Sequence, residues 1–114
     1  MENKSLSIVI INKQKQYCTQ TLVRIFNTKH QANKYVKSCT ISSNEYILIK
    51  TVKSSKYLVY VTISDLTTET TMTQIKTFKS NKKASEWLYS FDDIKDKIID
   101  SGSIIKIKSN INKI

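Results

Sequence analysis

The hydrophobic and polar positions of this chain follow one pattern that occurs twice. Residues 26–39 (FNTKHQANKYVKSC) and residues 78–91 (FKSNKKASEWLYSF) align when the sequence is shifted by 52 positions. Apolar side chains recur at positions 32, 35, 36 and 39 of the first segment and at 84, 87, 88 and 91 of the second. This is the spacing of one face of an amphipathic helix. Thr28 and Ser80 precede the two stripes and carry hydroxyl groups suited to an N-cap. The pattern therefore predicts two capped helices.

Around each helix the hydrophobic period changes to two residues, which is typical of β-strands. The expected strands are Leu6–Asn12, Thr19–Phe26 and Glu45–Val52 in the first half, and Lys56–Ile63, Thr71–Phe78 and Ser103–Lys108 in the second. After the second helix, Phe91, Ile94 and Ile98 again have helical spacing, and the only glycine, Gly102, follows them. We therefore expect the second helix to continue, or a short third helix to follow it, with Gly102 as its C-terminal stop.

These elements define the expected fold class, which is α+β with a tandem, pseudo-symmetric ββαβ repeat. The chain of 114 residues is long enough for one domain, made of two repeats at about 5–53 and 56–109, with a tail at 110–114. A three-stranded sheet is marginal alone, so the repeats should pair about a pseudo-two-fold axis. We expect a mainly antiparallel sheet with the two main helices packed on one face. One six-stranded sheet and two smaller sheets both fit the pattern.

Composition adds a strong positive charge. The formal net charge is +10, and Arg24 is the only arginine among 19 basic residues. This charge favours a nucleic-acid partner. Lysine, isoleucine and asparagine also have AT-rich codons, so an AT-rich phage or viral genome would raise the lysine content without such a partner. No apolar run approaches the roughly 20 residues of a membrane span, and no secretory signal is evident. We expect an intracellular protein, in the host cytoplasm or the virion if it is viral, with no membrane partner.

Catalytic chemistry is difficult to assemble from this sequence. His30 is the only histidine and is expected on the polar face of the first helix. The clustered aspartates are explained by a solvated helix face: Asp92, Asp93, Asp96 and Asp100. The two cysteines have no CxxC partner, and a single glycine cannot build a phosphate-binding loop. We therefore predict a non-enzymatic protein with no catalytic residues, no cofactor and no metal site.

Strand alternation predicts a basic and aromatic sheet surface. If both helices cover one face, the opposite face collects Arg24, Lys50, Lys76, Lys106 and Lys108 beside Tyr46 and Tyr60. Cations beside aromatic rings suit phosphate attraction and base stacking. A second cluster is expected at the helix starts, where backbone N–H groups attract anions: Lys79, Lys82 and Lys83, with Lys29 in the first copy. These residues predict binding of DNA or RNA with little sequence specificity, because bidentate base readout usually requires arginine.

The alternative hypothesis is a protein–protein interaction module, either a viral or phage inhibitor of a host factor or a virion component. Three residues favour it, because they are apolar or aromatic on the face expected to contact solvent: Leu22, Leu58 and Tyr60. An exposed apolar patch or an unpaired strand edge would then be the interface, including that of a homodimer.

Overall fold

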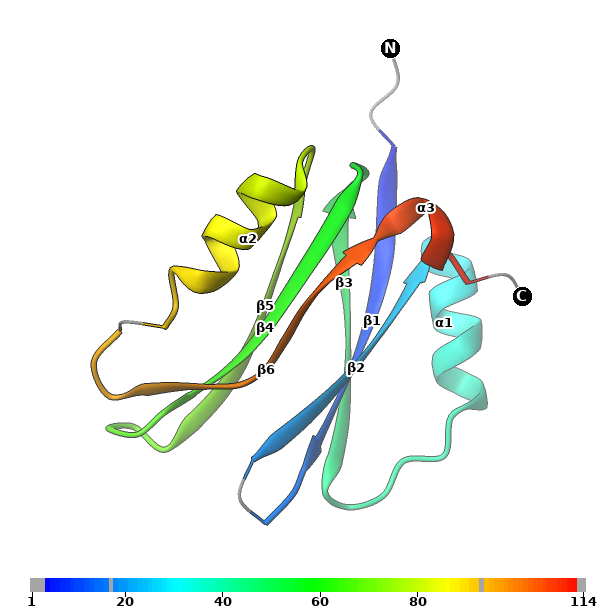
Figure 1. Cartoon of the computed structure of the whole chain (residues 1–114). Helices are drawn as coiled ribbons and strands as arrows, with labels where there is room; N and C mark the ends of the chain where they lie inside the picture. Colours follow the sequence, from blue (N-terminus) through cyan, green and yellow to red (C-terminus); the bar gives the residue numbers. More distant parts are fainter. Residues whose placement is uncertain (1–3, 17, 93, 113–114) are drawn as a thin grey trace.

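The described part of the chain, residues 4–16, 18–92 and 94–112 of a computed structural model, forms two small sheets and three helices. In chain order the elements are β1 (Ser5–Gln14), β2 (Thr19–Phe26), α1 (Lys29–Ser38), β3 (Glu45–Lys53), β4 (Tyr57–Asp65), β5 (Thr70–Phe78), α2 (Asn81–Tyr89), β6 (Lys97–Lys106) and α3 (Ile107–Asn110). Sheet A has the strand order β2-β1-β3, sheet B has the order β5-β4-β6, and all their pairings are antiparallel (Figure 1). The predicted α+β class is confirmed, in the version with two smaller sheets.

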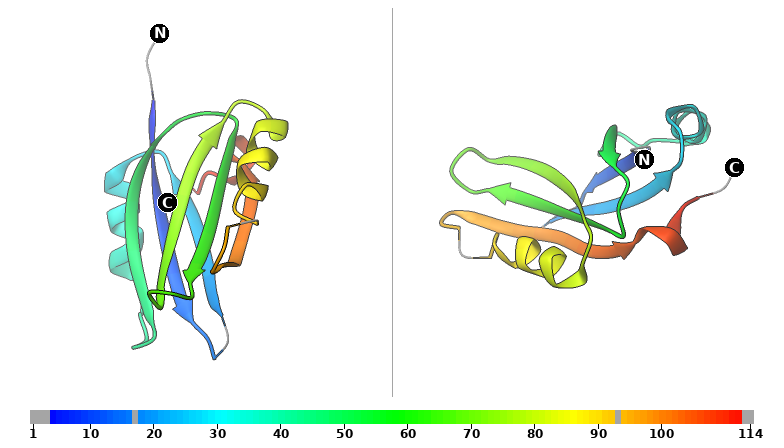
Figure 2. Two further views of the ribbon diagram at one scale, coloured as in Figure 1. Left: turned by 90° about the vertical axis from the view of Figure 1, so that its left-hand side faces the viewer. Right: turned by 90° about the horizontal axis from the view of Figure 1, so that it is seen from above.

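Each main helix packs on its own sheet, and the two sheets pack against each other between the helices. Helix α1 contacts β1, β2 and β3, whereas α2 contacts β4, β5 and β6. Strand β2 lies against β4 and β6, and β3 lies against β5, so the sheets form the two middle layers (Figure 2). The expectation that both helices pack on one face is therefore wrong. Each helix packs on the outer face of its own three-stranded sheet, and the other face of that sheet turns toward the other half.

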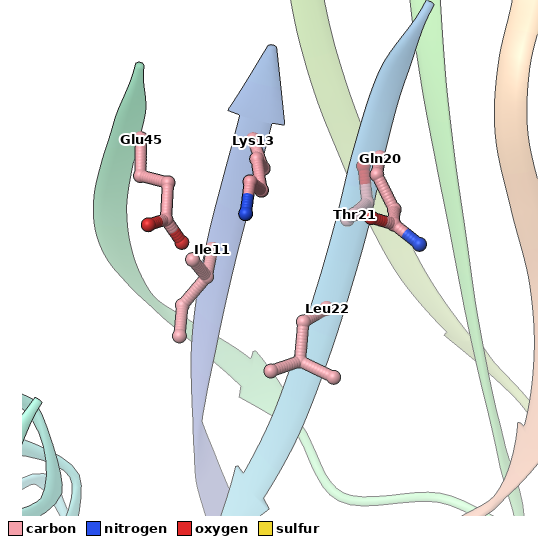
Figure 3. Close-up of a pocket in the computed structure, with 6 residues that line it drawn as sticks. All are labelled: Ile11, Lys13, Gln20, Thr21, Leu22 and Glu45. Carbon is pink, nitrogen blue, oxygen red and sulfur yellow. The ribbon is translucent and has the colours of Figure 1, made fainter. Parts of the chain in front are cut away.

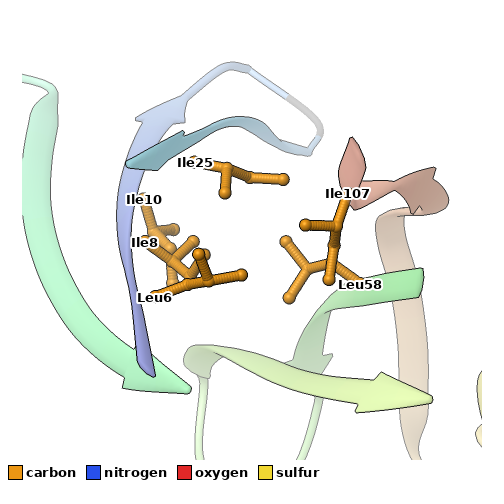
Figure 4. Packing of buried hydrophobic residues seen from close by; sticks show 6 residues of the cluster. All are labelled: Leu6, Ile8, Ile10, Ile25, Leu58 and Ile107. Carbon is orange, nitrogen blue, oxygen red and sulfur yellow. The ribbon is translucent and has the colours of Figure 1, made fainter. Parts of the chain in front are cut away.

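Strand β1 explains this layering, because it is buried on both faces. Leu6, Ile8 and Ile10 point toward sheet B and form one cluster with Ile25, Leu58 and Ile107 (Figure 4). Val9 and Ile11 point the other way and pack with residues of α1. Side chains alternate between the two faces of a strand, so an almost continuous apolar run can serve two interfaces at once.

The other end of the inter-sheet interface is polar. Asn12 and Thr62 are fully buried there, and Thr73 is nearly so. The Asn12 amide Nδ2 donates to Thr73 Oγ1 (2.9 Å), and Thr21 Oγ1 donates to Asn12 Oδ1 (2.8 Å). The hydroxyl groups of Thr21 and Thr62 are hydrogen-bonded to each other (2.5 Å), and Ser101 Oγ donates to Thr21 Oγ1 (3.0 Å). Buried polar groups are stable when they are hydrogen-bonded in this way, so the network joins the two sheets.

The predicted helix caps are confirmed. Thr28 Oγ1 accepts a hydrogen bond from the backbone N–H of Gln31 (3.1 Å), and Ser80 Oγ accepts one from the N–H of Lys83 (3.2 Å). In both cases the hydroxyl satisfies a backbone donor that has no partner within the helix.

The prediction of a helix ending at Gly102 is wrong. Residues 97–106 form strand β6, and Gly102 lies in its middle, opposite Val61. The residue with positive φ that precedes this strand is Asp96 (62°), not Gly102. A Cβ at Gly102 would lie 3.0 Å from Leu88 Cδ1 and 3.2 Å from the carbonyl oxygen of Tyr60. The glycine is therefore explained by the close approach of α2 to sheet B.

The last described residues return from sheet B to sheet A. Ile107 is buried in the inter-sheet cluster, but it begins α3 and does not continue the strand expected over Ser103–Lys108. Ile111 forms an isolated bridge with Ile25, and the N–H of Asn112 donates to the Ile25 carbonyl (2.7 Å). Residues 110–112, which belong to the expected tail, thus lie against β2.

Candidate functional site

The strand register brings the starts of both main helices to the same end of the molecule. Ser5 of β1 pairs with Lys53, and Ser7 pairs with Phe26, the last residue before the turn into α1. In sheet B, Tyr57 pairs with both Phe78 and Lys106. The segments 4–6, 26–31, 51–57, 76–84 and 105–112 therefore lie together, at the upper end in Figure 1. We call this the basic end.

The basic end carries ten lysines and no carboxylate within those five segments. The lysines are Lys4, Lys29, Lys53, Lys56, Lys76, Lys79, Lys82, Lys83, Lys106 and Lys108. Nearly all of the described acidic residues lie toward the opposite end, which carries the two hairpin turns and which we call the hairpin end: Glu45, Asp65, Glu69, Asp92, Asp96 and Asp100. Asp93, predicted to lie on a solvated helix face with Asp92, Asp96 and Asp100, lies outside the described residues. Charge is therefore separated along the molecule.

The helix N-termini add to the positive potential of the basic end. The first turns of α1 and α2 contain no acidic residue, although acidic side chains are favourable there. The positive ends of both helix dipoles therefore lie at the basic end, where they favour an anion. Lys82 and Lys83 lie in the first turn of α2, where like charges oppose the dipole. This arrangement disfavours the isolated helix and favours a bound anion.

The structure brings six of the ten residues predicted to bind nucleic acid to the basic end. They are Lys76, Lys79, Lys82, Lys83, Lys106 and Lys108. Their places differ: Lys76 is on β5 with its Nζ 5.5 Å from the centre of the Phe78 ring, and Lys108 is in α3. Sequence reasoning did not select Lys4, Lys53 and Lys56. Each lies at or next to a strand terminus, a signal that becomes informative only once the register is known.

The predicted basic and aromatic sheet face does not exist as one open surface. The face opposite each helix turns toward the other sheet. Tyr46 and Lys50 lie at its rim on the edge strand β3 and remain exposed, although Tyr46 OH accepts from Asn12 (3.0 Å) and Lys50 Nζ donates to the Thr73 carbonyl (3.2 Å). Tyr60 lies two residues after the buried Leu58 and therefore shares that face. Burial raises the pKa of the Tyr60 phenol. Arg24 lies on the helix side of β2, with its guanidinium donating to the Val23 carbonyl (3.3 Å). The expectation that seven residues share one face is therefore wrong.

Two grooves occupy the parts of the sheets that the main helices leave uncovered. In sheet A a hollow of about 280 Å³ is lined by Ile11, Lys13, Gln20, Thr21, Leu22 and Glu45 (Figure 3). In sheet B a hollow of about 170 Å³ is lined by Ile63, Asp65, Thr70, Met72, Gln74, Phe91, Ile94 and Lys97. Both lie at the hairpin end.

Each groove contains a residue of each charge on neighbouring strands. The central strand contributes the cation in sheet A and the anion in sheet B. In sheet A, Lys13 on the central strand pairs with Glu45 on the edge strand; in sheet B, Asp65 on the central strand pairs with Lys97. The Ser42 hydroxyl and N–H donate to Glu45 and hold the pKa of its carboxyl below the usual range, with a smaller contribution from Lys13. Leu22 and Met72 expose apolar surface beside these pairs, with 41% and 57% of each residue accessible.

Among residues 4–16, 18–92 and 94–112, no three His, Cys, Asp or Glu side chains are grouped as metal ligands would be. The helices of that part of the chain are all too short or too polar to cross a membrane.

Comparison with known proteins found no relative: no family model matches the chain, and neither a curated protein nor a solved structure is significantly similar to it.

Proposed function

We propose that this protein binds nucleic acid with little sequence specificity, through phosphate contacts at the basic end. The observation that carries the proposal is the separation of charge: ten lysines and two helix N-termini share one end, from whose segments carboxylates are absent. Nucleic acids are the polyanions whose closely spaced phosphates match such a surface. Lysine acts as a point charge, so this surface attracts phosphate without reading base edges.

Codon usage alone does not explain the separation of charge. Codon drift in an AT-rich genome would add lysines wherever the fold tolerates them. The hairpin end tolerates Lys13, Lys15, Lys95 and Lys97, but it mixes them with acidic residues. The segregation of the remaining charge favours selection for an anionic partner.

The test is a salt titration of binding to a fluorescent oligonucleotide, single-stranded or duplex. The affinity should fall steeply between about 50 and 200 mM salt, because each phosphate contact contributes roughly 0.7 to 0.9 to the slope of log K against log salt. Replacing Lys79, Lys82 and Lys83 by Gln should lower that slope by roughly two to three.

The matched control removes the same charge from the hairpin end, by replacing Lys13, Lys15 and Lys95 with Gln. It should leave the slope nearly unchanged. Equal losses in both triple variants would show that net charge alone, and not the basic end, determines binding. Absence of binding at about 50 mM salt would remove the proposal.

We further infer that the two halves descend from one ββαβ unit and are related by an approximate two-fold axis. The support is the polar network: Asn12 pairs with Thr21 across sheet A, and Thr62 pairs with Thr73 across sheet B. Each pair joins a central strand to the edge strand that follows it. Hydrogen bonds then connect the pairs reciprocally, from Asn12 to Thr73 and between Thr21 and Thr62. A crystal structure in which residues 5–53 and 57–106 do not superpose by a rotation of about 180° would contradict this inference.

A second candidate function is protein binding through the two grooves at the hairpin end. The observation that favours it is exposed apolar surface beside cross-strand charge pairs, at Leu22 in sheet A and at Met72 in sheet B. In a pull-down from host lysate, the natural protein should capture a protein partner such as a host factor. The Leu22→Asp variant should fail to capture it. Leu58, predicted to expose apolar surface to a partner, is fully buried and does not contribute. Retention by the Leu22→Asp variant would exclude the sheet A groove.

A further inference from the structure

A hollow at the basic end combines cations with an aromatic side chain. It has a volume of about 290 Å³ and is lined by Lys56, Tyr57, Lys106, Lys108 and Ser109. These residues come from the start of β4, the end of β6 and α3. Three lysines, a tyrosine and a serine therefore line one small open hollow. Its volume is near the lower limit for small-molecule sites, which suits a ligand of about one nucleotide.

The frame of this hollow is fixed by buried and hydrogen-bonded residues. Ile107 is buried between the sheets, and its N–H donates to the Lys56 carbonyl (3.0 Å). Asn110 Nδ2 donates to the Lys106 carbonyl (2.7 Å), which holds α3 against the end of β6. The backbone on both sides of Lys108 is thus anchored, while its side chain stays exposed. Preorganised groups lose less entropy when they bind a ligand.

The other half of the protein provides an internal comparison. In sheet A, Ser7 pairs with Phe26 and Thr51; in sheet B, Tyr57 pairs with Phe78 and Lys106. Phe26 and Phe78 correspond in the repeat, so Ser7 and Thr51 occupy the places of Tyr57 and Lys106. The residue before Ser7 is the buried Leu6, whereas the residue before Tyr57 is the exposed Lys56. The same local fold therefore forms without these cationic and aromatic side chains.

Building on the proposed function, we propose that this hollow binds one nucleotide unit, with its phosphate on Lys56, Lys106 and Lys108 and its base against the ring of Tyr57. Stacking on an aromatic ring is tolerant of base identity, because every base has a π-face. The lysines supply the phosphate contact, and Ser109 adds a hydroxyl that can donate to a phosphate or sugar oxygen. The second half is thus specialised for a ligand, and the first half lacks this site.

The experiment compares adenosine 5′-monophosphate, adenosine and inorganic phosphate as ligands, by amide chemical-shift titration of the full chain. The nucleotide should bind more tightly than either part, with shifts centred on residues 56–57 and 106–109. Tyr57→Ser introduces the residue that sheet A has at the corresponding place, Ser7, and should weaken nucleotide binding by roughly 5- to 150-fold. Tyr57→Phe keeps the aromatic ring and should retain nucleotide binding. Lys106→Thr should weaken binding of the nucleotide and of phosphate.

Control measurements separate this proposal from the general one. Tyr89→Ser removes an exposed tyrosine outside the basic end and should change nothing, and thermal unfolding verifies that each variant is folded. Equal affinity for nucleotide and phosphate, or nucleotide binding that ignores Tyr57→Ser, would overturn the pocket while oligonucleotide binding through the basic end still stands. Tyr57-dependent nucleotide binding without oligonucleotide binding would support the pocket and overturn the proposed function.

Discussion

The two ends of the inter-sheet interface solve the same packing problem with opposite chemistry. At the basic end the sheets meet through Leu6, Ile25, Leu58 and Ile107, which are all at most 3% exposed. Toward the hairpin end they meet through the hydrogen-bonded network around Asn12. The apolar contact underlies the most positively charged part of the molecule. The polar contact underlies the part where charges are mixed.

The apolar end and the polar end therefore contribute differently. The apolar end supplies most of the stability, and the polar end determines how the two sheets are placed relative to each other. Apolar burial is non-directional and supplies most of the stability, which the end carrying ten like charges needs to offset their repulsion. A hydrogen-bonded network contributes less net free energy, but its groups are costly to leave unpaired, so it favours one relative placement of the sheets. The comparison predicts that damage to the apolar end costs more stability.

The largest effect is expected from Leu58→Ala. This side chain is fully buried between the sheets, so its truncation leaves a cavity as well as losing buried area. We expect the free energy of unfolding to fall by about 2–5 kcal/mol, measured by urea denaturation. Leu66→Ala, at a leucine that is 56% exposed, is the control and should change it by less than about 0.5 kcal/mol. A loss at Leu58 no larger than that of the control would contradict the apolar assignment.

A smaller loss is expected from Asn12→Ala. Its amide bonds to Tyr46, Thr73 and Thr21, and truncation leaves those buried or half-buried groups without their partner. The expected loss is about 1–3 kcal/mol in the free energy of unfolding. Asn33→Ala on the exposed surface of α1 serves as the control and should not destabilise the protein. If Asn12→Ala costs more than Leu58→Ala, the proposed division between stability and sheet placement fails.

Reversing charge at the start of α2 should stabilise the fold and impair binding. Lys82→Glu and Lys83→Glu place negative charge beside the positive end of the helix dipole, which should add about 0.3–1 kcal/mol each to the free energy of unfolding. The same change at Lys37, in the last turn of α1, should destabilise by a similar amount. Chemical denaturation and oligonucleotide titration of the same samples test both effects. Stabilisation without weaker binding would show that these lysines make no contact with the ligand.

The smallest effect concerns Glu45 at the hairpin end. Hydrogen bonds from Ser42 lower the pKa of this carboxyl in the folded state. The folded state therefore binds the proton less readily than the unfolded state, and the stabilisation is present above the unfolded pKa and lost as pH falls through the folded pKa. Ser42→Ala should reduce the dependence of stability on pH across the acidic range, measured by thermal unfolding. An unchanged pH profile would mean that the exposed bond contributes nothing measurable.

Local patterns predicted the elements well because local chemistry determines them. The caps at Thr28 and Ser80 and the strand Thr19–Phe26 follow directly from hydroxyl placement and period-two alternation. The helix predicted after α2 does not form. Ile98 belongs to strand β6, and Ile94 belongs to the turn before it. Apolar spacing over such a short stretch fits both structures, and pairing with β4 decides between them.

The candidate site was predictable only in part, because it depends on contacts between distant segments. Lysines at the start of α2 were found from the helix pattern alone. Lys53 and Lys56 belong to the site because β3 ends, and β4 begins, beside the helix starts. Tyr46 and Lys50 lie exposed on the face opposite α1, as expected, whereas Arg24 lies on the helix side of its sheet and Tyr60 is half-buried. Alternation gives the two faces of a strand, and only the packing of the sheets tells which of them contacts solvent.

Gly102 limits which substitutions the second half of the protein can accept during evolution. Helix α2 lies so close to β6 that any larger residue at this position would collide with Leu88 and with the backbone of Tyr60. Leu88 belongs to α2, so the adjustment that a Cβ requires falls partly on the helix whose first turn carries Lys82 and Lys83. A substitution in the interior of a strand would thus act on a helix whose first turn belongs to the basic end, so the packing at Gly102 and the surface proposed to bind nucleic acid are linked.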